Sequence, residues 1–245
     1  MAITEENPGY KWVGTRPIRP DGVEKVTGKA RFGADLILPG MLHGKVVRSP
    51  HAHARIVSID TSAAESMEGV KAVITGADFP DLAANGAHPS DIDVANNTIA
   101  RDKVLYEGHV VAAVAAITRE QAEAAAKAVT VTYEVLPHVL TVDEAMADDA
   151  PLLHDAMITK GVDPAPEEPS NIASKILHER GDLDQGFGEA DSVVEREFTT
   201  KPVHQGYIEP HAAVADANTD GRAHIWCSSQ GHFQMRAYTA TVLGV

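Results

Sequence analysis

The sequence predicts an α+β protein, and three observations lead to this prediction. Short segments rich in β-branched residues, bounded by glycine or proline, recur between residues 31 and 76, as is typical of strands joined by tight turns. A continuous apolar run at 109–117 precedes an alanine-rich stretch and then "TVTYEVLP", which indicates a strand, a helix and a strand. Hairpin-like strands beside a unit of this kind favour the α+β class.

The first predicted elements follow a polar N-terminal arm, residues 1–20, which carries three prolines and is expected to be extended. Two strands joined by a turn at Pro39 and Gly40 are predicted from "RFGADLILPGMLHGKVVRSP". A further strand is predicted from "ARIVSIDTSAAESM", where a short helix follows and Asp60 or Thr61 is a suitable N-cap.

The middle of the chain carries the clearest helix signal. A strand ending at Gly76 is predicted from "GVKAVITGADFP", and the polar residues 84–97 predict a loop. The apolar run at 109–117 predicts a strand covered on both faces. Thr118 is a suitable N-cap for the helix "REQAEAAAKAV", and the next strand is expected to end at Pro137.

Proline and acidic residues divide the chain into four parts. We expect an arm at 1–20, an α+β domain at 21–145, a linker at 146–170 and the start of a second α+β domain at 171–245. In the last part, "SKILHERGD", "DSVVEREFTT" and "RAHIWCSS" predict strands, and the final stretch predicts an amphipathic helix.

Composition excludes several classes of protein. The 44% hydrophobic and 23% charged residues are ordinary for a soluble globular protein, and 21 Lys and Arg against 35 Asp and Glu give a net charge of -14. Such a charge disfavours nucleic acid and anionic membrane as partners. The acidic N-terminus has no apolar signal segment, so we expect a cytoplasmic protein. Cys227 is the only cysteine, so a thiolate-bound cluster would have to lie on a partner.

Two histidine-containing motifs are candidate sites. His51 and His53 would share one face of an extended segment, but the absence of acidic or cysteine ligands nearby favours a structural role over a metal pair. In "HQGYIEPHAAVA", the period of a strand would place four polar side chains on one side, where they either line a cavity or face water: Gln205, Tyr207, Glu209 and His211.

The C-terminal stretch "WCSSQGHFQMRAYTATVLGV" predicts a strand followed by a helix. Ser228 or Ser229 could cap the helix, which would place Gln230 in its first turn. A strand end before a helix N-terminus often faces a ligand, but spacing alone favours an ordinary capped helix here. The apolar stripe of the helix would contain Phe233, Ala237 and Ala240 or Thr241.

Long segments of the chain resemble the molybdenum-binding subunit of the xanthine dehydrogenase and aldehyde oxidase family. The likeness begins in "RPDGVEKVTGKARFGADLILPGMLHGKVVRSPHAHARIVSID", which is similar to the a/b hammerhead domain, and continues through "RDKVLYEGHVVAAVAA" and "GDLDQGFGEADSVVEREF". It covers nearly all residues from Val13 onward. The resemblance implies a hammerhead domain followed by the beginning of a molybdenum cofactor-binding α+β domain.

The resemblance also implies which residues meet the cofactor. The segment similar to "WCSSQ" would carry a glutamine, here Gln230, whose amide reaches an oxygen ligand of molybdenum, and Gly231 would lie beside it. No catalytic residue and no direct metal ligand are expected on this chain, because the glycine-rich loop and the general-base glutamate of the family follow later. His51 and His53 match a hammerhead segment without a metal role.

The implied activity is that of a molybdenum hydroxylase. Such an enzyme oxidises a carbon of an N-heterocycle, an aldehyde or an aromatic acyl substrate, takes oxygen from water, and passes electrons to iron–sulfur and flavin (FAD) subunits. We therefore expect a split molybdenum-pterin site, completed by a second polypeptide that carries the glycine-rich loop. The alternative is a noncatalytic scaffold or assembly module that keeps the hammerhead fold.

Overall fold

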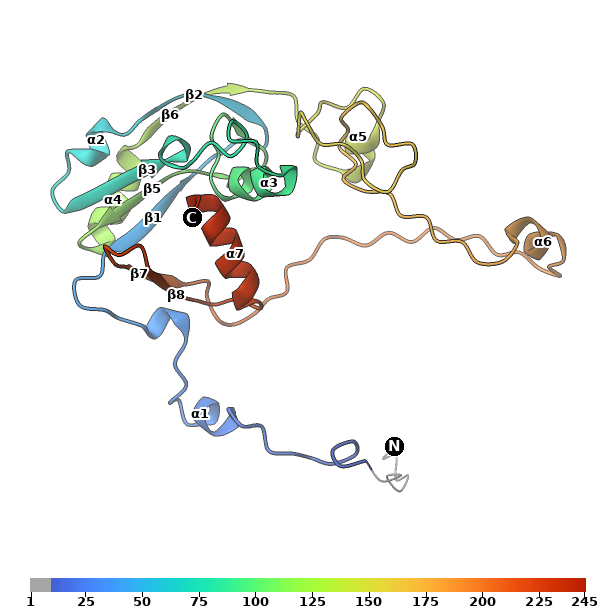
Figure 1. Ribbon diagram of the computed structural model, residues 1–245, viewed down its shortest axis with the longest axis horizontal. Coiled ribbons are helices and arrows are strands. Elements are labelled where there is room, and N and C mark those ends of the chain that lie inside the picture. Colours follow the sequence, from blue (N-terminus) through green and yellow to red (C-terminus); the bar gives the residue numbers. More distant parts are fainter. Residues whose placement is uncertain (1–9) are drawn as a thin grey trace. The chain divides into compact units, whose positions relative to one another are not determined.

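The computed structural model describes residues 10–245 (Figure 1). The chain falls into two units. The smaller unit combines the residues up to Pro39 with Val203–Gln230, and the larger combines Gly40–Pro202 with Gly231–Val245. Residues 1–9, which belong to the predicted arm, lie outside the described residues. Among the helices in the described part of the chain, none has the length and apolar character needed to cross a membrane.

The larger unit is built on two antiparallel three-stranded sheets. The first has the order β1-β5-β3 and the second β4-β2-β6. Their strands are β1 His43–Arg48, β2 Ala54–Asp60, β3 Val70–Thr75, β4 Lys103–Val104, β5 Val110–Ala116 and β6 Thr130–Val135. As predicted, the apolar run forms a central strand, β5, whose side chains are buried or half-buried along its whole length. Mixed helices and antiparallel sheets confirm the α+β class.

Helix α4, Arg119–Ala128, covers the first sheet and begins at the predicted cap. The Thr118 hydroxyl accepts a hydrogen bond from the Gln121 N–H at 3.2 Å, and the Gln121 side-chain oxygen accepts one in return from the Thr118 N–H. This reciprocal pair satisfies two of the N–H groups that a helix start leaves unpaired. Ala122 and Ala125 are buried against the sheet, where their small side chains allow close packing.

A strand ends at Gly76, as predicted, and the reason is a close backbone approach. A Cβ atom at Gly76 would lie 2.7 Å from the Ala100 carbonyl oxygen and 2.8 Å from the Arg101 Cα. Only glycine fits here without a shift of the backbone. The chain continues into the short 3₁₀ helix η2, Gly76–Asp78.

One helix prediction needs correction, and another holds for one of its two cap candidates, Asp60. Helix α2, Ser62–Glu65, forms, but the Thr61 side chain does not cap it, and the Asp60 carboxylate instead accepts from the Ser62 N–H at 3.0 Å. The loop predicted over residues 84–97 contains helix α3, Pro89–Thr98. Pro89 indicates a helix start, because proline suits the first helical position. The N-cap, however, is His88, an uncommon capping residue, and its Nδ1 accepts a hydrogen bond from the Ser90 N–H.

Three predicted strands are absent from the described residues. The segment after Arg31 forms a 3₁₀ turn, η1 Gly33–Asp35, because the Asp35 carboxylate accepts from the Phe32 N–H at 2.9 Å. Neither "SKILHERGD" nor "DSVVEREFTT" forms a strand, and helix α6, Leu183–Gly188, lies between them. A strand needs a neighbour for its backbone hydrogen bonds, and among the described residues these two segments have one isolated bridge, between Ser174 and Lys160.

The predicted linker is ordered by side-chain hydrogen bonds that follow helix α5, Val142–Met146. The Asn171 amide donates to the carbonyl oxygens of Ala145 and Pro151, each at 3.1 Å, and its oxygen accepts from the Leu153 N–H at 3.0 Å. One amide therefore holds both ends of the excursion together.

The smaller unit contains helix α1, Gly22–Val26, the turn η1 and the hairpin of β7, Ala213–Ala217, and β8, Ala223–Cys227. In the larger unit the last helix, α7 His232–Leu243, packs on α3, and Val242 is buried. Both the last strand and the terminal helix are present as predicted.

A fully buried histidine anchors α3 to the sheet. His109 donates from Nε2 to the Asn96 carbonyl oxygen at 2.8 Å and accepts at Nδ1 from the Leu105 N–H at 3.2 Å, while its ring stacks on Tyr106. Both ring nitrogens are used by the neutral form, so protonation would break the bond from Leu105. Burial lowers the pKa of His109, and the hydrogen bond to Asn96 offsets this effect only in part.

We predict that the free energy of unfolding falls as pH drops below the ordinary histidine pKa of about 6.5. The pKa of His109 is lowered in the folded chain, so the unfolded chain binds the proton more readily. Acidification therefore stabilises the unfolded chain relative to the folded one. The contribution of neutral His109 to the free energy of unfolding is complete above about pH 6.5 and is lost as the pH falls below it. Urea unfolding at pH 7.5 and 5.5 measures this slope.

His109→Gln should reduce the pH dependence and should also cost about 1–3 kcal/mol at pH 7.5, because buried polar groups lose a partner. The exposed His178 supplies the matched control, His178→Gln, which should retain the wild-type slope. An unchanged slope in His109→Gln would show that other groups cause the pH dependence.

Candidate functional site

The predicted cofactor residues follow directly after β8, so the β7–β8 hairpin determines where they lie. The two strands pair from Ala217 opposite Ala223 to Ala213 opposite Cys227. One more pair continues the hairpin: the Ser228 N–H donates to the Ala212 carbonyl oxygen at 3.1 Å, and the Ala212 N–H donates to the Ser228 hydroxyl at 3.1 Å. Gln230 therefore lies two residues beyond Ser228, the last paired residue of the hairpin.

The prediction that Ser228 or Ser229 caps the last helix is wrong. Helix α7 begins at His232 with Gly231 as N-cap, so Gln230 precedes the helix instead of lying in its first turn. The Ser228 hydroxyl pairs with the hairpin instead. Sequence reasoning missed this partner because a serine between a strand and a helix is suited to either role.

Gln230 carries an exposed side-chain amide that makes no hydrogen bond to any residue from 10 to 245. A neutral amide offers two donors and an acceptor, so it can bind an oxygen ligand without adding charge. The next residue, Gly231, has no side chain, and a Cβ atom there would meet only Gln234. The predicted role of Gln230 and Gly231 beside a cofactor remains a prediction, and an exposed amide next to a residue without a side chain leaves room for such a ligand.

The polar segment before β7 is not a strand, so its four candidate side chains do not share one face. Tyr207 and His211 come together: the Tyr207 hydroxyl hydrogen-bonds to His211 Nε2, and the two rings meet edge to face. Glu209 is half-buried and its Oε1 accepts from the Gly33 N–H at 3.4 Å. Gln205 is exposed.

His51 and His53 have structural contacts. His53 is buried and donates from Nδ1 to the Pro137 carbonyl oxygen at 2.6 Å, while the His51 ring packs edge-on against Tyr133. Over the described residues 10–245, no group of three or more His, Cys, Asp or Glu side chains could hold a metal ion.

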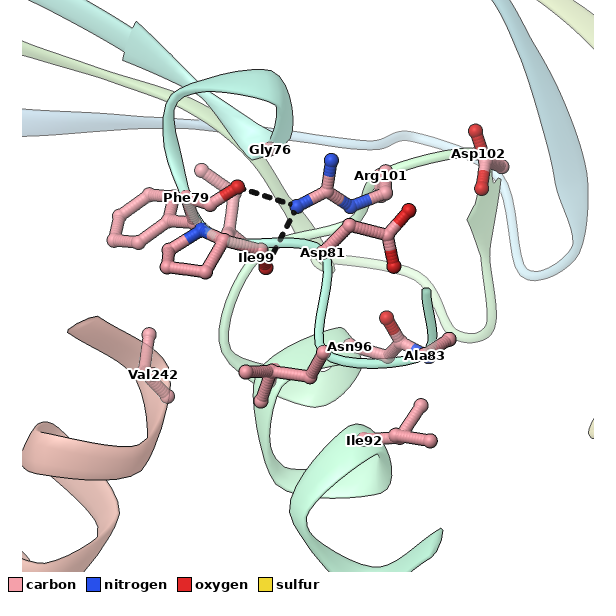
Figure 2. A pocket seen from close by; sticks show the side chains of 13 residues that line it. Gly76, Phe79, Asp81, Ala83, Ile92, Asn96, Ile99, Arg101, Asp102 and Val242 are labelled. Carbon is pink, nitrogen blue, oxygen red and sulfur yellow. Dashed lines mark hydrogen bonds between the residues drawn. The ribbon is translucent and has the colours of Figure 1, made fainter. Parts of the chain in front are cut away.

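A small cavity of about 160 Å³ lies elsewhere, in the larger unit between η2, α3 and α7 (Figure 2). Arg101 borders it and donates to the carbonyl oxygens of Phe79 and Pro80, at 2.7 and 3.0 Å, so its guanidinium serves to hold the loop after η2. Val242 of α7 closes one side. None of the predicted site residues lines this cavity.

Comparison with known families identifies both parts of the chain. Residues 27–137 match the a/b hammerhead domain of aldehyde oxidase and xanthine dehydrogenase, and residues 164–245 match the molybdopterin cofactor-binding domain. The chain therefore belongs to the aldehyde oxidase and xanthine dehydrogenase family, and it carries the hammerhead domain and the start of the molybdenum cofactor-binding domain.

Individual relatives agree with this assignment. A probable xanthine dehydrogenase subunit of Bacillus subtilis is 36% identical over 93% of this chain, and the "Nicotinate dehydrogenase large molybdopterin subunit" of Eubacterium barkeri is 32% identical over 96%. The structure of CO dehydrogenase from Oligotropha carboxidovorans is 34% identical over 94% of this chain, with a TM-score of 0.74. The chain spans 28%, 52% and 29% of these three proteins, respectively.

We predict that Glu209 holds the η1 turn against the hairpin. Glu209→Ala removes the acceptor of the Gly33 N–H, so the Gly33 amide should exchange with solvent about 3- to 10-fold faster, as expected for the loss of one hydrogen bond. Amide hydrogen exchange followed by NMR measures this rate. Glu209→Gln keeps an acceptor and should stay near wild type, and equal rates in all three proteins would contradict the assignment.

Proposed function

We propose that this chain supplies the hammerhead domain and the first part of the cofactor-binding domain to a molybdenum hydroxylase. Such an enzyme oxidises a carbon of an N-heterocycle, an aldehyde or an aromatic acyl substrate with water as the oxygen source. The observation that carries the proposal is the exposed, unpartnered amide of Gln230 at the end of β8, inside the segment that matches the molybdopterin cofactor-binding domain.

The residues of this chain would position the cofactor. When bound, the molybdenum-pterin cofactor would supply the redox chemistry at the substrate carbon. Gln230 would donate an amide hydrogen bond to an oxygen of the cofactor and so orient it, and Gly231 would let the backbone pass close by because it has no side chain. The general-base glutamate and the glycine-rich loop would come from polypeptide outside these 245 residues.

Exposed apolar side chains support a site that is shared with more polypeptide. Phe233 on α7 is 82% exposed, Phe198 is 85% exposed and Ile208 is 99% exposed. Contiguous apolar surface commonly marks interaction sites, and we propose that these side chains are covered by more polypeptide in the assembly. The predicted apolar stripe of α7 fits this view at Phe233 and Ala237, whereas Ala240 is already half-buried.

The assembly we propose contains the polypeptide with the glycine-rich loop, an iron–sulfur subunit and a flavin subunit, and acts in the cytoplasm on a small molecule. Among the relatives, one is named as a large molybdopterin subunit and another as the gamma subunit of a dehydrogenase complex, which is consistent with a multi-subunit enzyme. The division into parts at residues 20, 145 and 170 remains a prediction.

The metal content of the native complex tests the proposal against the scaffold alternative. We expect about one molybdenum per copy of this chain, together with iron, when a tagged chain is isolated with its partners from its host and analysed by mass spectrometry of the elements. A complex that assembles stoichiometrically but contains neither metal would support the noncatalytic scaffold.

Gln230→Ala tests the assigned contact. Loss of one oriented donor at a reacting centre lowers kcat by about 10²- to 10³-fold, and we expect a decrease of this order with molybdenum content unchanged. Gln234→Ala is the matched control, because Gln234 is a nearby glutamine whose amide donates to the Tyr238 hydroxyl within α7. Wild-type turnover of a fully loaded Gln230→Ala enzyme would exclude the role.

A further inference from the structure

The chain leaves the β7–β8 hairpin at Ser228 through an irregular hydrogen-bonded pair. In a regular antiparallel pair, two facing residues exchange N–H to C=O bonds in both directions. The Ser228 N–H follows this rule and donates to the Ala212 carbonyl oxygen at 3.1 Å. The return bond differs: the Ala212 N–H donates to the Ser228 hydroxyl, also at 3.1 Å. A side-chain oxygen has taken the place of the strand's own carbonyl.

This substitution has a geometric consequence for the next residues. Because the Ser228 carbonyl is released from the pair, the backbone can turn out of the sheet directly after Ser228. Because the hydroxyl still accepts from Ala212, the pair stays closed and the turn begins at a defined position. A short hydroxyl side chain can provide such a local bond to the backbone, whereas alanine cannot.

The pair is also covered by the η1 turn of the same unit. A Cβ atom at Gly33 would lie 3.4 Å from the Ala212 carbonyl oxygen and 3.5 Å from the Ser228 nitrogen, so the backbone of η1 lies directly against both residues. The Glu209 carboxylate holds η1 in place through the Gly33 N–H. The exit from β8 is therefore enclosed by contacts from two separate segments.

We infer that Ser228 is a positioning residue that sets the place and direction of Gln230 through this hydroxyl bond. Without the hydroxyl, the Ala212 N–H either stays unpaired or takes up the residue 228 carbonyl. The second outcome lengthens the strand by one residue, and since side chains alternate along a strand, it redirects the residues that follow. The functional consequence for Gln230 rests on the proposed function, whereas the bond itself does not.

Amide exchange of the 245-residue chain, followed by NMR, tests the bond without any cofactor. In Ser228→Ala the Ala212 amide should exchange about 3- to 10-fold faster, as expected for a lost hydrogen bond, whereas Ser228→Thr keeps the hydroxyl and should restore protection. Ser58→Ala, at an exposed serine of β2, is the matched control and should leave Ala212 unchanged. Unchanged exchange in Ser228→Ala, or a threonine variant as fast as the alanine variant, overturns the inference.

Turnover of the assembled enzyme tests the effect on Gln230. Ser228→Ala should lower kcat about tenfold, with KM and molybdenum content close to wild type, and Ser228→Thr should recover most of it. A loaded Ser228→Ala enzyme with wild-type kcat overturns the positioning role even if the bond exists. A complex without molybdenum contradicts the proposed function instead, and the exchange experiment still decides whether Ser228 controls the exit from the hairpin.

Discussion

Pairing of backbone N–H and C=O groups is the constraint on which the structure of this chain depends, because a strand is stable only beside a neighbour. In the larger unit, β5 has β1 on one side and β3 on the other, and its side chains are enclosed in the core. In the smaller unit, β7 and β8 have one strand partner each, namely one another. Among the described residues, the segments on either side of α6 form one isolated bridge, between Ser174 and Lys160, and neither becomes a strand.

Buried and half-buried polar side chains stabilise the larger unit in a different way. His109 satisfies both ring nitrogens between α3 and the loop before β5, and Asn171 uses both ends of its amide to close the excursion after α5. In each case one side chain hydrogen-bonds several backbone N–H or C=O groups that have no partner in a helix or sheet. Gln230 stands in contrast, since its amide has equivalent chemistry but no partner in the described part of the chain. Such hydrogen-bonding groups have internal partners in the larger unit, whereas the Gln230 amide, which follows β8 in the smaller unit, is left available for a ligand.

Local sequence was a good guide at several elements whose determining contacts are local. The capping box at Thr118 and the apolar strand that follows His109 depend on residues close in sequence. The strand end at Gly76 was also predicted, although its cause is the close approach of the Ala100 and Arg101 backbone, which lies far along the chain. The loop predicted for residues 84–97 was wrong because a histidine caps α3, which propensity rules do not favour. The two strands predicted near α6 were wrong for another reason: a strand needs a neighbouring strand, and local sequence cannot supply one.

For the candidate site, the sequence by itself determined the type of residue and the family: the glutamine after "WCSS", the glycine beside it, and a resemblance that the family matches confirmed. Only the tertiary structure decided what Ser228 does. Serine can cap a helix or bond to a neighbouring strand, and the choice depends on Ala212, which lies 16 residues earlier and reaches Ser228 only when the hairpin closes. Sequence specifies the hydrogen-bonding groups that a residue offers, but the fold selects their partner, because a hydrogen bond requires two groups within about 3 Å of one another.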